Sequence, residues 1–277
     1  MNLENRTVLV TGASSGIGAA TARRLAARGA AVALVARRRR ELDAVADELG
    51  DQGHVYRCDV GDPAAVTAMA QQVTADLGTP DVIVNNAGAG RWLWIEETTN
   101  EEFLEQVAVP FHAAFFVTRA FVIPMLKRRS GWVVNVHSPV SQWSWPGAIG
   151  YGASRWGLRG FDECLAADLR GTGIGVTAVV AGHTDSDYFD TNAGALDRMP
   201  SLDRLCRRLS CDDVAQMIVT GVEHERRTVV EPLEIRLTNV AARLAPRAVA
   251  WLLGASGATR SSVPPGPVRR AEPERGR

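Results

Sequence analysis

The chain has 277 residues, enough for one α/β domain with a buried core, and its 31 basic and 31 acidic residues give a formal net charge of zero. That balance argues against nucleic acid as a partner and against a general attraction to anionic membranes. Four scattered cysteines form no CxxC pair and five histidines show no metal-ligand spacing, so we expect reduced thiols, a cytoplasmic location and no metal site. The first residues lack the charged and apolar regions of a signal peptide, and we expect no membrane-spanning segment.

Strand-like and helix-like segments alternate from the start of the chain. Short apolar or β-branched runs predict strands over Thr7–Val10, Ala31–Val35, His54–Arg57, Asp81–Val84, Trp132–Val136 and Gly175–Val180. Apolar positions at helical spacing predict helices over Ala19–Arg28, Glu41–Leu49, Pro63–Leu77, Glu101–Arg129 and Tyr151–Leu169. Pro110 and Pro124 predict a kink or break in the fourth of these helices. The alternation is typical of a Rossmann-type, doubly wound α/β fold, with a parallel sheet between two layers of helices.

The last third of the chain departs from this alternation. Residues 184–209 are polar, mixed and poorly periodic. Ile235–Leu253 is an apolar helix candidate that contains three arginines and no acid. The Gly, Pro, Ser and charged residues from Ala255 onward predict a disordered tail over residues 255–277. We therefore expect one folded domain over residues 1–254.

The turn between the first predicted strand and the first helix is rich in glycine. The sequence VLVTGASSGIG places Gly12, Gly16 and Gly18 there. Glycine permits a tight turn and lets the backbone approach a pyrophosphate, and the N-terminus of the following helix offers free N–H groups and a positive dipole. The strand–turn–helix context therefore favours a dinucleotide site over an ordinary glycine-rich turn.

The chain resembles the short-chain dehydrogenase/reductase family in several motifs that occur in the family's order. TGASSGIG fits the TGxxxGxG pattern, Cys58-Asp59-Val60 is similar to the segment that contacts adenine, and Asn85-Asn86-Ala87-Gly88 is similar to the NNAG segment after the fourth strand. The resemblance extends from the first strand to the sixth. It implies a bound nicotinamide dinucleotide with contacts from Gly12, Ser14, Ser15, Gly16, Ile17, Gly18, Asp59, Val60, Asn86, Ala87, Gly88, Tyr151, Arg155, Gly182 and Thr184.

The end of the second predicted strand distinguishes the two nicotinamide cofactors. NAD-preferring members of the family tend to have an acid there that binds the ribose hydroxyls, but this chain has four successive arginines from Arg37. A guanidinium pairs well with a phosphate through charge-assisted hydrogen bonds. We therefore predict NADP(H), with Arg37 as the chief ligand of the 2′-phosphate and Arg38 and Ser14 as helpers. A solvated charge run at a helix start is the favoured interpretation of Arg39 and Arg40.

The resemblance also implies catalytic residues. Ser138 follows the fifth strand and Tyr151 opens the next helix, where the family's serine and tyrosine hold the substrate oxygen and the tyrosine is the general acid or base. An ordinary tyrosine has a pKa of about 10, so a nearby cation must favour the phenolate. The family supplies a lysine four residues later, but this chain has Arg155, which keeps the charge and cannot release a proton. We expect tyrosine activation to survive while the proton relay changes.

Two further positions depart from the family. Pro110 stands where the family often has an asparagine that holds a relay water, and Ala181-Gly182 replaces the usual Pro-Gly. Three interpretations stay open: an active reductase with an altered proton path, which we favour; non-redox chemistry such as dehydration, cyclisation or isomerisation; and a cofactor-binding protein with little catalysis. His137 and His183 are candidate proton carriers, although structural or substrate contacts are the favoured roles of both.

Tryptophans cluster in two loops expected at the carboxyl ends of the fourth and fifth strands, where doubly wound sheets bind ligands. They are Trp92, Trp94, Trp143 and Trp145. Together they favour a bulky hydrophobic substrate, aromatic or polycyclic ones included, although single rings can instead pack loop bases or a subunit contact. Residues 184–209 lie where the family has a mobile substrate lid, with Tyr188 and Phe189 as its expected contacts.

Ile235–Leu253 admits two interpretations. Its basic and apolar character is compatible with a membrane or a lipid substrate. Packing against the domain or a partner subunit is favoured, because three arginines are a weak basic face and Pro246 interrupts the helix. The resemblance further implies a homodimer or homotetramer formed through the helix that carries Tyr151. It implies as activity an NADP(H)-dependent ketone or aldehyde reductase or alcohol dehydrogenase.

Overall fold

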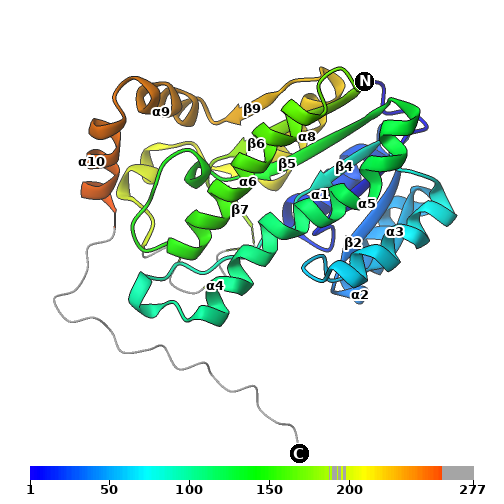
Figure 1. The fold of residues 1–277 in the computed structure, drawn as a ribbon, viewed down its shortest axis with the longest axis horizontal. Helices are drawn as coiled ribbons and strands as arrows, with labels where there is room; N and C mark the ends of the chain where they lie inside the picture. Colours follow the sequence, from blue (N-terminus) through cyan, green and yellow to red (C-terminus); the bar gives the residue numbers. More distant parts are fainter. Residues whose placement is uncertain (187, 189–191, 193–194, 196–197, 258–277) are drawn as a thin grey trace, which may run out of the picture.

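Seven parallel strands form the central sheet of the computed structural model, which describes residues 1–186, 188, 192, 195 and 198–257 (Figure 1). In spatial order they are β3 (Gly53–Arg57), β2 (Ala31–Ala36), β1 (Thr7–Thr11), β4 (Val82–Asn85), β5 (Gly131–His137), β6 (Ile174–Ala181) and β9 (Thr228–Glu231). Most of their apolar side chains are buried, as a parallel sheet covered on both faces requires. The strand order reverses between β1 and β4, and such a switch point opens a crevice at the carboxyl ends of the strands.

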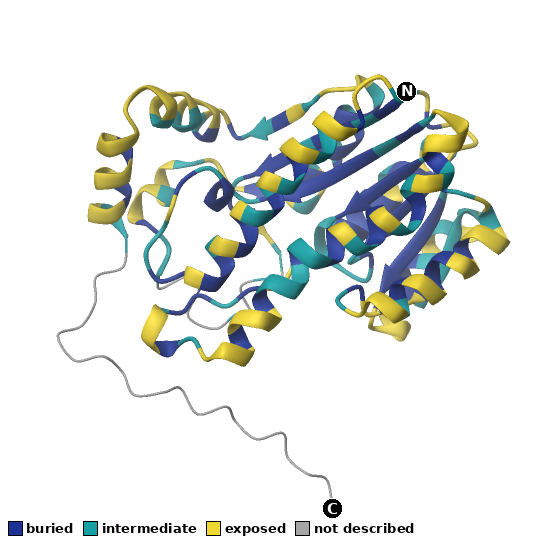
Figure 2. Ribbon diagram, in the orientation of Figure 1, coloured by how far each residue is buried: buried dark blue, intermediate teal, exposed yellow. Residues whose placement is uncertain are grey.

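Helices cover both faces of the sheet, and two hydrophobic clusters fill the space between the layers (Figure 2). One face carries α1 (Gly16–Ala26), α2 (Arg39–Leu49) and α8 (Cys211–Glu223). The other carries α3 (Pro63–Leu77), α5 (Ala113–Arg128) and α6 (Ile149–Asp168). The expected doubly wound α/β fold is confirmed, and its predicted elements lie within a few residues of their expected limits. α8 and β9 lie outside the predicted elements.

The helix before β5 is interrupted at Pro110, as expected. α4 (Asn100–Val107) ends at a π-helical turn over Ala108–His112, in which Val109 has the non-helical angles φ −132° and ψ 120°. The Val109–Pro110 peptide bond is cis. The interruption turns α4 away from the direction of α5 and brings Ala108 and Val109 to the wall of the cleft described below.

The second expected interruption, at Pro124, is absent. α5 runs through this residue, because Phe121 and Met125 on either side of it are buried in the core and hold the helix against the sheet. By length and composition alone, Asn100–Arg128 could also cross a membrane, since an 18-residue window within it has a mean hydropathy of 1.6. This finding differs from the expectation of no such segment. In the fold, this run is divided at the π-helical turn and its second part serves as a core helix.

The helix predicted over Ile235–Leu253 is two helices. They are α9 (Leu233–Leu244) and α10 (Pro246–Ser256). Pro246 divides them because it cannot continue a helix, whereas it is well suited to the first position of a new one. α10 extends past Ala255, where the disordered tail was expected to begin, and the rest of that tail lies outside the described residues.

The predicted lid has its two ends tied together. β7 (Thr184–Asp185) pairs in parallel with β8 (Leu209–Ser210), and a short 3-10 helix over Ser201–Leu205 lies between them in the chain. Tyr188 belongs to the described residues of this segment, whereas Phe189 lies outside them. The paired ends fix where the segment leaves and rejoins the domain, beside the carboxyl end of β6.

Candidate active site

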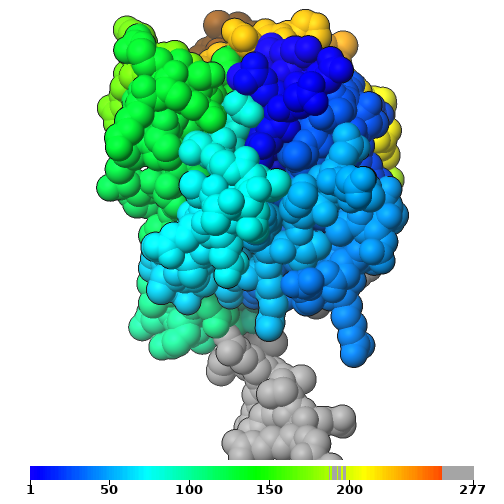
Figure 3. Space-filling model, turned by 90° about the vertical axis from the view of Figure 1, so that its right-hand side faces the viewer, coloured from blue at the N-terminus to red at the C-terminus, as the bar shows by residue number. Residues whose placement is uncertain are grey.

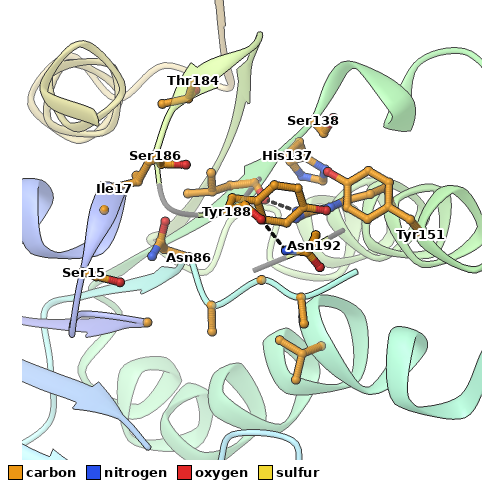
Figure 4. Close-up of a pocket in the computed structure, with 18 of the residues that line it drawn as sticks. Ser15, Ile17, Asn86, His137, Ser138, Tyr151, Thr184, Ser186, Tyr188 and Asn192 are labelled. Carbon is orange, nitrogen blue, oxygen red and sulfur yellow. Dashed lines mark hydrogen bonds between the residues drawn. The ribbon is translucent and has the colours of Figure 1, made fainter. Parts of the chain in front are cut away.

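A cleft of about 1090 Å³ opens at the carboxyl ends of the strands (Figure 4). Its walls come from the turn after β1, the ends of β2 and β3, the loop after β4, the end of β5, α6 and the segment after β6. These walls combine segments from distant parts of the chain; Figure 3 shows blue and cyan N-terminal segments packed against the green segments that follow them. Every residue assigned by resemblance to the cofactor lines this cleft except Gly18.

The glycine turn after β1 meets two backbone requirements. Gly12 and Gly16 have φ angles of +67° and +55°, in the left-handed region that favours glycine. Gly18 lies behind the turn, where a β-carbon would stand 2.1 Å from the carbonyl oxygen of Gly12, so it permits close packing of α1 on the turn. α1 has no acid in its first turn, and its N-cap residue Ser15 makes no side-chain capping bond. A helix start of this kind offers its first N–H groups to an anion in the cleft.

Two arginines stand beside this helix start. Arg38 Nη2 donates hydrogen bonds to Ser15 Oγ at 2.7 Å and to Ser14 Oγ at 3.2 Å. The Arg37 side chain is 75% exposed, and its Nη1 lies 3.9 Å from Asp59 Oδ2. So loose a pair in solvent contributes little to stability, and Arg37 can therefore turn to a phosphate in the cleft at small cost.

The loop after β4 is held against β1 by a small set of hydrogen bonds. Thr11 Oγ1 accepts from the backbone nitrogen atoms of Asn86 and Ala87, both at 3.0 Å. Asn86 Nδ2 donates to the carbonyl oxygen of Thr11 at 2.9 Å, so this side chain braces the loop as well as lining the cleft. A β-carbon at Gly88 would stand 3.1 Å from Arg155 Nη2, which shows how closely the loop approaches α6.

α6 carries a stripe of buried polar side chains. Tyr151, Arg155 and Asp162 follow helical spacing, and all three are buried. Arg155 Cζ lies 5.1 Å from the centre of the Tyr151 ring, and Arg155 Nη1 donates to the carbonyl oxygen of Val136 at 2.9 Å. The guanidinium therefore lies over the face of the phenol ring. Its buried Nε has no hydrogen-bond partner among the described residues.

Ser138 follows β5 directly and lies at the same end of the cleft as Tyr151 (Figure 4). It caps a 3-10 turn over Pro139–Ser141, in which Ser138 Oγ accepts a long bond of 3.4 Å from the backbone nitrogen of Val140. Capping uses only a lone pair of the oxygen. The hydroxyl hydrogen can therefore donate to a substrate oxygen.

A buried polar network lies behind this end of the cleft. His137 Nε2 is 2.6 Å from Asp162 Oδ2, and the other oxygen of Asp162 accepts a hydrogen bond from Asn135 Nδ2. Asn135 Oδ1 accepts in turn from Asn85 Nδ2 at 2.8 Å. His137 lines the cleft, so the network reaches the surface of the site. No motif marks Asp162, although its spacing from Tyr151 places both on one helix stripe.

Aromatic rings enclose the phenol of Tyr151. Trp92 stacks on it with ring centres 5.9 Å apart and an interplanar angle of 24°, and Trp145 lies 5.5 Å from Trp92. Tyr188 approaches from the segment after β6, with its ring centre 6.3 Å from that of Tyr151, and burial raises the pKa of the Tyr188 phenol. Gly90 permits this packing, because a β-carbon there would stand 2.3 Å from Tyr151 Cδ2.

Two of the four tryptophans expected in the pocket lie elsewhere. Trp143 packs in a separate hydrophobic cluster with Ile235 of α9 and Leu253 of α10. Trp94 lies outside the cleft lining, with Arg198 Cζ 5.9 Å from its ring centre. The physical reason is that α9 and α10 bury apolar side chains on this side of the domain, and Trp143 fills the space under them. Trp92 and Trp145 do line the cleft.

A buried ion pair joins the Trp92 loop to the segment after β6. Arg198 Nη1 and Nη2 donate to the two carboxylate oxygens of Glu97 at 2.5 and 2.9 Å, and Nη1 also donates to the carbonyl oxygen of Trp92 at 2.7 Å. The Glu97 side chain is 1% exposed. The hydrogen bonds from Arg198 hold the pKa of Glu97 below its usual value. No sequence motif marks this pair, because its members lie far apart in the chain.

Comparison with known proteins gives this arrangement a context. The family described as short chain dehydrogenase matches residues 6–195 of the chain. The 3-oxoacyl-(acyl-carrier-protein) reductase FabG of Escherichia coli (strain K12) is 34% identical over 206 residues, which cover 73% of this chain and 84% of that protein.

Solved structures are similar over most of the fold. A short-chain dehydrogenase from Streptomyces avermitilis has a TM-score of 0.79 and 27% identity, and the match covers 88% of this chain and 95% of that one. A short-chain dehydrogenase from Sphingobium yanoikuyae in complex with NADPH has a TM-score of 0.75 and 25% identity, and the match covers 92% and 98% of the two chains. The similarity therefore extends over most of this chain and nearly the whole of each solved structure.

Proposed function

The chain belongs to the short-chain dehydrogenase family, and from that premise we propose that it is an NADP(H)-dependent oxidoreductase that interconverts a carbonyl group and an alcohol. One observation carries the proposal. Ser138 and Tyr151 stand together at one end of a cleft whose other end is formed by the glycine turn and two arginines. That arrangement offers a site for a substrate oxygen and a site for a dinucleotide within one cavity.

The residues present fit an NADP(H) molecule. The glycine turn and the start of α1 would hold the pyrophosphate, and Arg37 with Arg38 would hold the 2′-phosphate. The buried Nε of Arg155, which lacks a partner among the described residues, would donate to a ribose hydroxyl. A similar solved structure contains NADPH, which supports this assignment. When bound, the cofactor supplies or accepts hydride at its nicotinamide ring.

The chain's own residues would handle the substrate oxygen and its proton. Ser138 and Tyr151 would both hydrogen-bond the oxygen, and the Tyr151 phenol would give its proton to the alkoxide that forms during reduction. Arg155 lies over the phenol ring, with its Cζ 5.1 Å from the ring centre. A guanidinium does not release a proton near neutral pH, so another group must restore the proton of Tyr151.

The substrate end of the cleft favours a bulky hydrophobic molecule. Trp92 and Trp145 line that end of the cleft, and Tyr188 and Met199 add apolar area from the segment after β6. Such walls recognise a flat or extended apolar group through area and shape rather than through charge. We therefore propose ketones or aldehydes with an aromatic or polycyclic body, or the corresponding alcohols.

The proposal includes a homo-oligomer in the cytoplasm. α5 and α6 expose an apolar groove of about 340 Å³ on their outer surfaces, and Phe115 in it is 48% exposed. A second copy of the same helices could cover this groove, in agreement with the dimer or tetramer expected from the family resemblance. The four cysteines are all free thiols, which supports a reducing compartment.

Turnover of NADPH with a panel of bulky ketones and aldehydes tests the proposal. We expect oxidation of NADPH, and Tyr151→Phe should lower kcat by about 10²–10⁴-fold while the dissociation constant for NADPH stays within about threefold.

Non-redox chemistry is the second candidate, because Arg155 and Pro110 replace the lysine and asparagine that the family usually has. Tight NADPH binding without oxidation by any member of the panel would support that candidate over the first. An unchanged rate in Tyr151→Phe would remove Tyr151 from the mechanism.

A further inference from the structure

We propose that His137, held by Asp162, is the group that exchanges protons with Tyr151, a role that rests on the oxidoreductase function proposed above. His137 Nε2 lies 2.6 Å from Asp162 Oδ2, and the two side chains are 1% and 2% exposed. His137 Nδ1 is buried and has no hydrogen-bond partner among the described residues, although His137 lines the cleft. Buried polar atoms are rarely left unpaired, so this nitrogen is available to a group that arrives in the site.

The hydrogen bonds of the pair define the state of the imidazole. A carboxylate only accepts, so the bond from His137 to Asp162 places the ring proton on Nε2 and leaves a lone pair on Nδ1. Asn135 Nδ2 donates to the second oxygen of Asp162, which fixes the carboxylate. Nδ1 thereby keeps the lone pair that can accept a proton.

The sheet positions this network. Asn85 of β4 and Asn135 of β5 are register partners, and Asn85 Nδ2 donates to Asn135 Oδ1 at 2.8 Å and to Thr118 Oγ1 of α5 at 3.1 Å. A polar chain therefore runs from α5 through two neighbouring strands to Asp162 on α6. Buried chains of this kind hold their members rigidly, because an unpaired member would be costly. His137 is the end of this chain that reaches the cleft.

The charged and titratable groups around the pair are compatible with proton storage. Arg155 faces it from the Tyr151 side, bonded to the carbonyl oxygen of the residue that precedes His137. Arg227, from the segment before β9, donates to the backbone oxygen of Asp162 at 2.9 Å. When His137 accepts a proton, the imidazolium and the Asp162 carboxylate together carry no net charge. The neighbouring carboxylate therefore offsets the cost of charging a buried ring.

A second imidazole–carboxylate pair lines the cleft on its other side, at the segment after β6. His183 Nδ1 lies 2.7 Å from Asp203 Oδ2, and both residues belong to the segment after β6. Asp162, by contrast, shares a helix stripe with Tyr151. Figure 4 shows His137 grouped with Ser138 and Tyr151 at one end of the pocket. These placements single out His137 as the proton partner.

The proton step balances without any further reactant. In the oxidation direction the alcohol gives its O–H proton to the phenolate oxygen of Tyr151, and the phenol then gives a proton to the Nδ1 lone pair of His137, directly or through one water molecule. In the reduction direction the imidazolium returns its proton to the phenolate that remains after Tyr151 has protonated the substrate oxygen. No electrons move in this step. The route requires neither a lysine at position 155 nor an asparagine at position 110.

Replacing both members of the pair by amide side chains tests the role of His137 while keeping hydrogen bonds in the interior. In the double variant His137→Gln/Asp162→Asn, neither side chain titrates, and both can still hydrogen-bond. We expect kcat to fall about 100-fold, with the KM for the substrate and the NADPH dissociation constant within about threefold of the parent values. The ionisation that belongs to the pair should also disappear from the pH dependence of kcat. Asp162→Asn alone keeps the imidazole and should lower kcat about tenfold, which provides a second variant if the double variant fails to fold.

A measurement without cofactor separates this role from a structural one. Tyrosinate absorbance is titrated in the parent and in Tyr151→Phe, and the difference gives the signal of Tyr151. The same difference in the His137→Gln background, which keeps the Asp162 charge, should have a midpoint raised by about one pH unit or more, because the phenol has lost its proton acceptor. His224→Gln is the matched control, because this exposed ring has as its hydrogen-bond partner, among the described residues, only the carbonyl oxygen of Thr220, at 3.2 Å. It should change neither kcat nor the midpoint.

The two readouts give distinct outcomes. A folded double variant with unchanged kcat, together with an unchanged Tyr151 midpoint in His137→Gln, would overturn the assignment of His137. If the parent protein turns over no substrate of the panel, the oxidoreductase proposal fails, while the cofactor-free titration still decides whether His137 exchanges protons with Tyr151. A shifted midpoint with inactive parent protein would retain the pair and reject the redox function.

Discussion

Backbone atoms form most of one end of the cleft, and side chains form most of the other. The cofactor end consists largely of backbone, at Gly12, Gly16 and the start of α1, with exposed arginines beside it. The substrate end consists of side chains, with Trp92 and Tyr188 packed against Tyr151 on long connections. The position of a site formed by backbone follows from the strand register and a short motif. The position of a site formed by side chains depends on which distant segments pack against each aromatic ring. The two ends should therefore respond differently to substitution.

Two tryptophan substitutions test the side-chain end and have the largest expected effects. Trp143→Ala removes a ring buried under α9 and α10, so the free energy of unfolding should fall by about 3–5 kcal/mol while the KM for the substrate stays unchanged.

Trp92→Ala removes the ring stacked on Tyr151 and should raise the KM for the substrate about tenfold or more, in addition to its cost in stability. Urea unfolding and steady-state kinetics measure both. Equal effects of the two variants on KM would contradict the division between pocket and packing rings.

The backbone end is tested through cofactor discrimination. Arg37→Ala removes the proposed ligand of the 2′-phosphate, so the dissociation constant for NADPH should rise by about 10–100-fold, the worth of a charge-assisted hydrogen bond. The dissociation constant for NADH should stay the same, because NADH lacks that phosphate. Arg40→Ala is the matched control, since Arg40 is exposed on α2 and lies outside the cleft lining. A parent protein that binds both cofactors equally would refute the NADP(H) preference.

The contrast also explains how far the sequence predicted the fold. Five of the six predicted strands are largely buried apolar runs, and β3 follows a glycine stop. In β9, by contrast, only Val229 is buried, and the preceding α8 carries no motif. Pro110 and Pro246 interrupt helices as their chemistry requires. Pro124 does not, because Phe121 and Met125 pack on the core and tertiary contacts outweigh local preference.

In the candidate site, the cofactor end could be predicted from the sequence better than the substrate end. The assigned cofactor residues other than Gly18 all line the cleft, since a glycine turn after a buried strand has few possible geometries. Trp94 and Trp143 could not be distinguished from Trp92 and Trp145 by sequence, because the contacts that separate them are tertiary: Trp143 packs against α9 and α10, and Trp94 lies beside Arg198. The only sequence signal for Asp162 is its helical spacing from Tyr151. Its pairing with His137 of β5 depends on how α6 packs on the sheet, which the sequence does not show.

The smallest expected effect is on the stability of the protein at acidic pH. The variant that tests it, Glu97→Gln, also compares the two ends of the cleft. Arg198 holds the pKa of Glu97 below its usual value, so the ionised pair stabilises the fold fully above the unfolded carboxylate pKa of about 4.3, and this contribution is lost as pH falls through the lower folded value. Glu97→Gln removes it, so the variant should be less stable at neutral pH and lose less stability between about pH 5 and pH 3. Urea unfolding across that range measures the two slopes, and parallel slopes would contradict the assignment. Since Arg198 also holds the backbone of Trp92, the variant should raise the KM for the substrate and leave NADPH binding unchanged at the backbone-built end.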